Sequence, residues 1–123
     1  MKRRDVGELT DAQLVERFAT IALAQEKATL HDEYAKYNKL FDEMELVAGE
    51  LKSRPGDQRR RLVVLYTHNS PEVRLKAAIH TLAVALEEAK NVLKIIKDRG
   101  EFPPAADAYG MLSALDEGRY IPE

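Results

Sequence analysis

The sequence predicts an all-α fold of about six helices, and three observations lead to this prediction. Apolar residues recur three and four positions apart through most of the 123-residue chain. Helix-start signals stand at Thr10 and Ser70, where a capping side chain precedes an apolar repeat. The strand-like run at residues 62–65 has no second run with which it could pair. We therefore interpret this run as helical, with a buried strand as the alternative.

A capping box predicts the first helix, at residues 11–28. Thr10 stands at the N-cap position and Gln13 follows three residues later, so each side chain can bond the other's backbone N–H. The inward positions after it recur at helical spacing, and only the last is polar: Leu14, Phe18, Ile21, Ala22 and Gln25. We expect residues 1–9 to be disordered. The basic residues near the start are not followed by an apolar segment, so we expect no signal peptide.

The longest apolar stripe predicts a second helix of about 22 residues. Its members are spaced alternately four and three positions apart: Leu30, Tyr34, Tyr37, Phe41, Met44, Ala48 and Leu51. We expect the aromatic members to lie in the core rather than to form a platform that stacks nucleic-acid bases. Pro55 and Gly56 end the helix, because proline disfavours helix at the residue before it.

Four shorter helices are expected in the rest of the chain. They cover residues 57–66, 71–83, 86–99 and 105–117, and residues 119–123 form a tail. The 71–83 helix starts at an N-cap serine, Ser70, with a proline at its first position. It carries two apolar patches, so we expect neighbours on two sides. Glycines at positions 100 and 118 are expected to end helices, and Gly110 is expected to permit close helix contact.

The segment from about residue 57 to residue 117 resembles HEAT-type repeats. A turn, a proline and then Val73-Arg74-Leu75-Lys76-Ala77-Ala78 form the opening of such a repeat helix. With residues 14–18, 22–25 and 114–118, this segment makes the chain similar to a small bacterial family of unknown function. That family has a HEAT/armadillo-like α-α superhelix. The resemblance implies one repeat-like domain over residues 1–123, no catalytic residues, and a surface that binds other macromolecules.

Composition narrows the classes of function. The net charge is −2, and neither half of the chain has the basic excess that nucleic-acid binding usually needs. The absence of cysteine excludes disulfides, thiolate metal sites and cysteine nucleophiles, and it is compatible with the cytoplasm that we expect. No run of about 18 apolar residues exists, so we expect no membrane span.

Residues with catalytic or metal-binding chemistry do not form a recognisable pattern. The three histidines, His31, His68 and His80, lack metal-ligand spacing, and we expect them to be solvated or structural. The paired carboxylates flank apolar stripes, as solvated faces do. No phosphate-binding glycine loop or nucleophile elbow is present. We therefore expect no enzyme activity, no metal and no cofactor.

Five arginines are the candidate partner-binding residues. Arg59-Arg60-Arg61 and Arg54 form a basic corner near the start of the third helix. This corner either contacts a phosphate, an acidic protein or a nucleic acid, or it is a solvated face partly neutralised by Asp57 and the acids of the second helix. For Arg74, the resemblance to HEAT-type repeats implies a bridge to a carboxylate of a neighbouring helix rather than contact with a ligand.

These observations favour a non-enzymatic protein–protein interaction module or adaptor, whose partner is another protein. The alternative is a nucleic-acid-binding HEAT-like domain that uses an Arg/Lys face.

Overall fold

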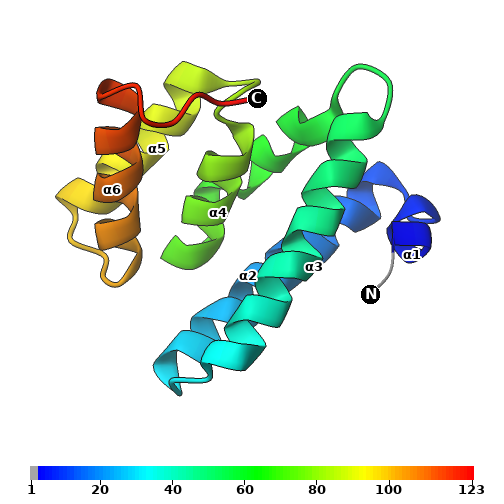
Figure 1. Ribbon diagram of the computed structural model, residues 1–123, viewed down its shortest axis with the longest axis horizontal. Coiled ribbons are helices and arrows are strands. Elements are labelled where there is room, and N and C mark those ends of the chain that lie inside the picture. The colour runs from blue at the N-terminus through cyan, green and yellow to red at the C-terminus, as the bar shows by residue number, and fades with distance from the viewer. Residues whose placement is uncertain (1–2) are drawn as a thin grey trace. The chain divides into compact units, whose positions relative to one another are not determined.

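The structure is a computed structural model that describes residues 3–123, and it is all-α. Over this range it contains six α-helices, one 3-10 helix and no strand (Figure 1). The helical interpretation of residues 62–65 is confirmed, although they belong to a 3-10 helix, η1 (Gln58–Thr67). The chain forms two compact units, of which the first ends at Arg61 and the second is Leu62–Glu123. The single domain over residues 1–123 stays a prediction.

A helical hairpin makes up most of the N-terminal unit. Helices α2 (Asp11–Leu30) and α3 (Tyr34–Ser53) lie side by side (Figure 1). The capping box is confirmed, because Thr10 Oγ1 accepts the N–H of Gln13 at 3.1 Å and Gln13 Oε1 accepts the N–H of Thr10 at 2.9 Å. All five predicted inward residues of α2 are buried: Leu14, Phe18, Ile21, Ala22 and Gln25.

A short helix before the hairpin corrects the expectation of a disordered start. Helix α1 (Arg3–Gly7) packs on α3, and the side chain of Val6 is only 1% exposed. Periodicity could not predict it, because a five-residue helix with one buried side chain shows no repeat. Residues 1 and 2 of the expected disordered segment lie outside the described residues.

The predicted apolar stripe is buried only in its C-terminal part. Its fully buried members are the last three: Met44, Ala48 and Leu51. Tyr34 is 72% exposed and Phe41 is 46% exposed, so the prediction that they lie in the core is wrong. Leu30, 73% exposed, ends α2 instead of starting α3. Helix α1 packs near the other end of α3, where Val6 lies by Gly49 and Ser53, and not at the exposed start of the stripe.

Three helices form the core of the C-terminal unit. Helices α4 (Pro71–Thr81), α5 (Leu86–Asp98) and α6 (Pro104–Asp116) pack on one another (Figure 1). They share one buried apolar cluster: Leu75, Ala78, Leu82, Ala89, Leu93, Ile96, Ala105 and Ala108. The N-cap of α4 is confirmed, since Ser70 Oγ accepts the N–H of Val73 at 3.2 Å. The second patch of α4 is also buried, with Val73 and Ala77 both 0% exposed.

Glycines end α5 and α6 as predicted. At the end of α5 the N–H of Glu101 donates to the Ile96 carbonyl at 3.3 Å, and that of Gly100 donates to the Lys97 carbonyl at 3.0 Å. This is a Schellman motif, which needs the positive φ of 62° that Gly100 adopts. Within α6, a Cβ added at Gly110 would meet no atom within 4 Å. The expectation of close helix contact at Gly110 is therefore wrong.

Candidate functional site

Arg74 is the centre of a hydrogen-bonded cluster in the C-terminal unit. Its place in the first turn of α4 and the Schellman motif after α5 bring it to Glu101. Nη1 and Nη2 of Arg74 each donate to a Glu101 carboxylate oxygen at 2.8 Å. Nε donates to the His68 carbonyl oxygen at 2.8 Å, and Nη2 also donates to that of Asn69 at 3.4 Å. Arg74 thus makes the expected carboxylate bridge, although Glu101 lies in the α5–α6 loop and not on a helix.

This ion pair changes the pKa of both partners. The hydrogen bonds from Arg74 lower the pKa of the Glu101 carboxyl below its ordinary value of 4.5, and the nearby charges of Arg74 and Arg99 add to this effect. The same hydrogen bonds raise the pKa of the Arg74 guanidinium. The side chains of Arg74 and Glu101 are 12% and 24% exposed, so the pair is largely shielded from water. Both groups are therefore charged at neutral pH, and each neutralises the other.

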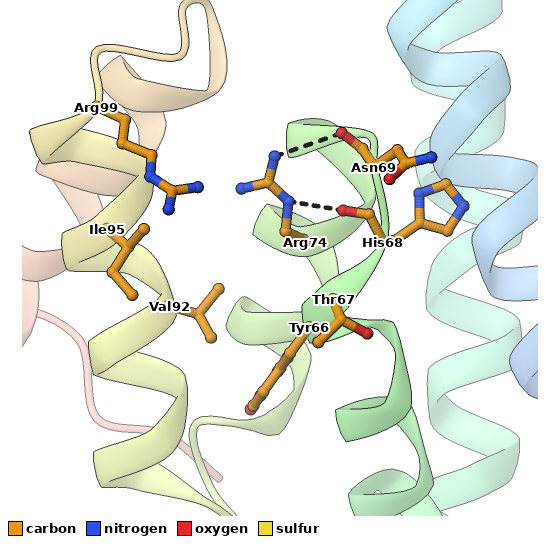
Figure 2. Close-up of a pocket in the computed structure, with 8 residues that line it drawn as sticks. All are labelled: Tyr66, Thr67, His68, Asn69, Arg74, Val92, Ile95 and Arg99. Atoms are coloured by element: carbon orange, nitrogen blue, oxygen red, sulfur yellow. Dashed lines mark hydrogen bonds between the residues drawn. The ribbon is translucent and has the colours of Figure 1, made fainter.

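An open pocket of about 390 Å³ lies beside this cluster (Figure 2). It is lined by residues of η1, the η1–α4 connection, α4 and α5: Tyr66, Thr67, His68, Asn69, Arg74, Val92, Ile95 and Arg99. Val92, Ile95 and Arg99 are spaced three and four positions apart, so they share one face at the end of α5. The Tyr66 ring comes from η1, and its hydroxyl is hydrogen-bonded to Thr81. The pocket therefore has an apolar wall and a polar rim.

Arg99 is the cation of this pocket whose donors remain available. Figure 2 shows its guanidinium extending from the end of α5 into the space that faces Arg74. The Arg99 side chain is exposed, and among residues 3–123 it has no ion-pair partner within 4 Å. Arg74, Glu101 and Arg99 together carry a net charge of about +1, from two cations and one carboxylate. The net positive charge of the pocket thus lies at the Arg99 guanidinium.

His68 and Asn69 accept hydrogen bonds from Arg74 through their backbone carbonyl oxygens. Figure 2 shows their carbonyl oxygens directed at the Arg74 guanidinium while both side chains turn away from it. Nδ1 of His68 accepts the N–H of Ser70 at 3.0 Å, so the neutral ring carries its proton on Nε2. The backbone here is committed to holding Arg74, which leaves Arg99 to meet a ligand.

The structure places Arg54 in a second arginine cluster, in the N-terminal unit. Its Nε donates to Glu50 at 2.8 Å, Nη1 donates to Asp11 at 2.8 Å, and Nη2 donates to the Leu9 carbonyl at 2.6 Å. Hydrogen bonds to Glu50 and then to Asp11 raise the pKa of Arg54. This side chain fastens the start of α2 to the end of α3, so its donors are used within the unit.

The remaining basic corner is largely compensated by acids. Arg59 pairs with Asp57 at 2.7 Å, and its hydrogen bond lowers the pKa of that carboxyl. Arg61 lies 3.2 Å from Asp11, which Arg54 also contacts. Arg60 is exposed. The corner is therefore a set of local ion pairs, and the role of these arginines in partner binding stays a prediction.

Arg99 and Glu101 were not among the predicted site residues. The position of Arg99 near the end of a helix has an ordinary explanation, because a cation there interacts favourably with the helix dipole. The spacing of Val92, Ile95 and Arg99 was the signal that could have placed Arg99 on the same helix face as two apolar residues. Glu101 carries no such signal, because it meets Arg74 across 27 residues of sequence.

The described part of the chain, residues 3–123, holds neither a membrane-spanning helix nor a cluster of metal-ligating side chains. No helix there is both long and apolar enough to cross a membrane. No group of three or more histidine, aspartate or glutamate side chains among residues 3–123 could hold a metal ion.

Comparisons with known proteins relate the chain to a family and to one crystal structure. The family model described as "Domain of unknown function (DUF2019)" matches residues 12–116. The crystal structure is that of the protein RPA1889 from Rhodopseudomonas palustris CGA009, with 39% sequence identity and a TM-score of 0.94. The similarity covers 96% of this chain and 98% of that one. The comparison with curated proteins gave no match.

Proposed function

We propose that this chain, which belongs to the family described as a domain of unknown function (DUF2019), is a non-enzymatic module that binds another protein. The open pocket beside Arg99 is the observation that carries this proposal. Ile95 in its wall is 38% exposed, and Phe102, in the loop after Arg99, is 72% exposed. Arginine and aromatic side chains dominate the binding energy of protein interfaces. Exposed apolar side chains beside an arginine are therefore typical of a contact surface.

A finer description of the fold belongs to the same proposal. The chain is a HEAT/armadillo-like module, as the repeat-like opening at Val73-Arg74-Leu75-Lys76-Ala77-Ala78 suggests. The pairing of α5 with α6 supports this description, because such repeats are built from packed helix pairs. Surfaces of these proteins bind other macromolecules. The lack of cysteine supports a cytoplasmic location, where disulfides are rare.

The test is reconstitution with a purified partner. A protein captured on the immobilised chain is purified, and its affinity is measured by isothermal titration calorimetry. Phe102→Ser is expected to weaken binding roughly tenfold or more, as loss of an interface aromatic does. Ile121→Ser is the control, since Ile121 is 74% exposed but lies in the C-terminal tail. Failure of every purified candidate to bind below about 100 μM would contradict the proposal.

Nucleic-acid binding is the alternative, and the geometry supports it less well. Arg54, Arg59 and Arg61 each pair with a carboxylate, so fewer cations remain to neutralise phosphates. A gel-shift series from about 50 mM salt upward tests it. Binding to duplex DNA that weakens steeply with salt would favour this alternative over the protein-binding module.

A further inference from the structure

We infer that the pocket between Arg99 and the η1–α4 connection binds a glutamate side chain in an extended segment of a partner polypeptide. This inference rests on the proposed function and names the chemistry of the partner. Three properties of the pocket carry it: an available guanidinium, an apolar wall next to that guanidinium, and an open rim.

The guanidinium selects the charge of the ligand. Arg74 donates to Glu101 and to two backbone carbonyls. Arg99, in contrast, has no ion-pair partner within 4 Å among residues 3–123. A guanidinium presents a planar fork of N–H donors, which matches one carboxylate in a bidentate pair. With one available fork and a net local charge of about +1, the site fits a monoanionic carboxylate better than a phosphate dianion.

The apolar wall selects the stem that carries the charge. Ile95 lies one helical turn before Arg99 on the same face of α5, and Val92 lies one turn earlier. The Tyr66 ring adds a further apolar surface from η1. A glutamate side chain has two methylene groups behind its carboxylate, so its stem can cover Ile95 while its oxygens reach Arg99.

The open rim indicates a polypeptide rather than a small molecule. Thr67 and Asn69 are exposed at the pocket edge, where their side chains can bond a peptide backbone. Phe102 lies beyond Arg99, and its ring stands 3.7 Å from the position of a Cβ added at Gly100. This ring is 72% exposed and lies outside the pocket lining, so it can contact a partner only beyond the glutamate. The C-terminal unit has seven basic and nine acidic side chains, so Arg99 is a local positive point on an acidic unit.

The test is an NMR titration of the full chain with three probes. These are acetyl-Ile-Glu-Ile-amide, the same peptide with Gln for Glu, and glutarate. We expect the Glu peptide to shift the amide signals of residues 66–69 and 92–99, with an affinity about fivefold above that of the Gln peptide. Arg99→Gln is expected to reduce this ratio to about one. Lys94→Gln, which removes an exposed cation of α5 outside the pocket lining, is expected to preserve it.

Several outcomes would overturn the inference. Equal affinity for the Glu and Gln peptides, or a preference that survives Arg99→Gln, would remove the role of the guanidinium. Glutarate binding as tightly as the peptide would assign the pocket to small carboxylates. If the peptides leave these amides unmoved while a purified partner still binds, the inference fails and the proposed function stands. If no protein partner binds but the Glu preference persists, the proposed function fails and the pocket chemistry stands.

Discussion

At the scale of single residues, each unit contains a largely shielded arginine that joins distant parts of the chain. Arg74 binds a carboxylate and two carbonyls, and Arg54 binds two carboxylates and the carbonyl of Leu9. Arginine suits this role because its charge is permanent and its five donors lie in one plane. Both side chains are largely shielded, at 12% and 18% exposed, so their donors need these partners.

Replacement of Arg74 is expected to destabilise the protein. Arg74→Gln removes charge-assisted hydrogen bonds and leaves Glu101 without its cation, which costs about 2 kcal/mol in the free energy of unfolding. Urea denaturation followed by circular dichroism measures this loss. Arg119→Gln is the matched control, because Arg119 and Glu117 form a pair in which both side chains are 59% exposed. Its cost is expected to stay below about 0.5 kcal/mol, and equal losses in the two variants would contradict the role of Arg74.

The ion pair also makes stability depend on pH. Because the pKa of Glu101 is lowered in the folded state, its contribution is complete above the unfolded value near 4.5. It is lost as the pH falls through the lower, folded pKa. Glu101→Gln is therefore expected to be less stable than the wild type at pH 6, with a gap that narrows below about pH 4.5. Urea denaturation from pH 7 to pH 3 measures the gap, and a gap that is constant with pH would show that the carboxylate charge contributes nothing.

The sequence could predict that Arg74 bridges to a carboxylate, but not which carboxylate it contacts. The resemblance to HEAT-type repeats implied a bridge from Arg74 to a carboxylate. The pairs that form join residues 27 and 43 positions apart, because helix packing brings them together. No local pattern encodes such a contact. Arg54 was therefore placed in a solvent-facing corner by its neighbours in sequence, and its hydrogen bonds to Leu9 and Asp11 could not be foreseen.

At the scale of elements, the helix ends that carry a capping signal were predicted well because capping is local. Thr10, Ser70 and Gly100 act within a few residues of themselves, so the side-chain and backbone rules that govern them can be applied along the sequence. Elements without such signals were missed. Helix α1 is too short to show a period, and the 3-10 form of η1 has the same apolar content as an α-helix would have.

A pair of glycine substitutions tests the helix ends and the helix interior. Gly100→Ala forces alanine into a positive φ of 62°, which is expected to cost about 1 kcal/mol in the free energy of unfolding. Gly110→Ala places a Cβ in open space within α6 and is expected to add about 0.5–1 kcal/mol of stability. Thermal and urea denaturation measure both changes. If Gly100→Ala stabilised the protein as Gly110→Ala is expected to do, position 100 would not need a positive φ. That result would rule out the Schellman geometry at the end of α5.

At the scale of the whole molecule, the all-α class was predictable because helical periodicity runs through most of the chain. Which apolar side chains end up exposed was not. Tyr34 and Phe41 continue the stripe of α3 that buries Leu51, but exposure depends on whether another helix lies against that part of the stripe. Periodicity identifies the apolar face of a helix, but it does not show whether another helix packs on that face. The same limit applies to the pocket, where residues of η1 and α5 meet through the fold of the C-terminal unit.

The net charge of the whole chain likewise does not show where charge is concentrated. The chain has a net charge of −2, and this value disfavours a nucleic-acid backbone as its main partner. That average hides a local positive point at Arg99, in a unit with more acids than bases. Arg99 lines the same pocket as exposed Ile95, and this combination of charge and apolar surface is what a protein interface needs.

The most direct test of the central claim is the dissociation constant of a purified partner protein for the wild type and for two charge variants. If the Arg99 pocket is the contact site, Arg99→Gln weakens binding about tenfold or more, and Lys94→Gln changes it less than about twofold. Both variants remove one positive charge from the α5 region, so general electrostatics would affect them alike. Binding by Arg99→Gln that matches the wild type would contradict the account.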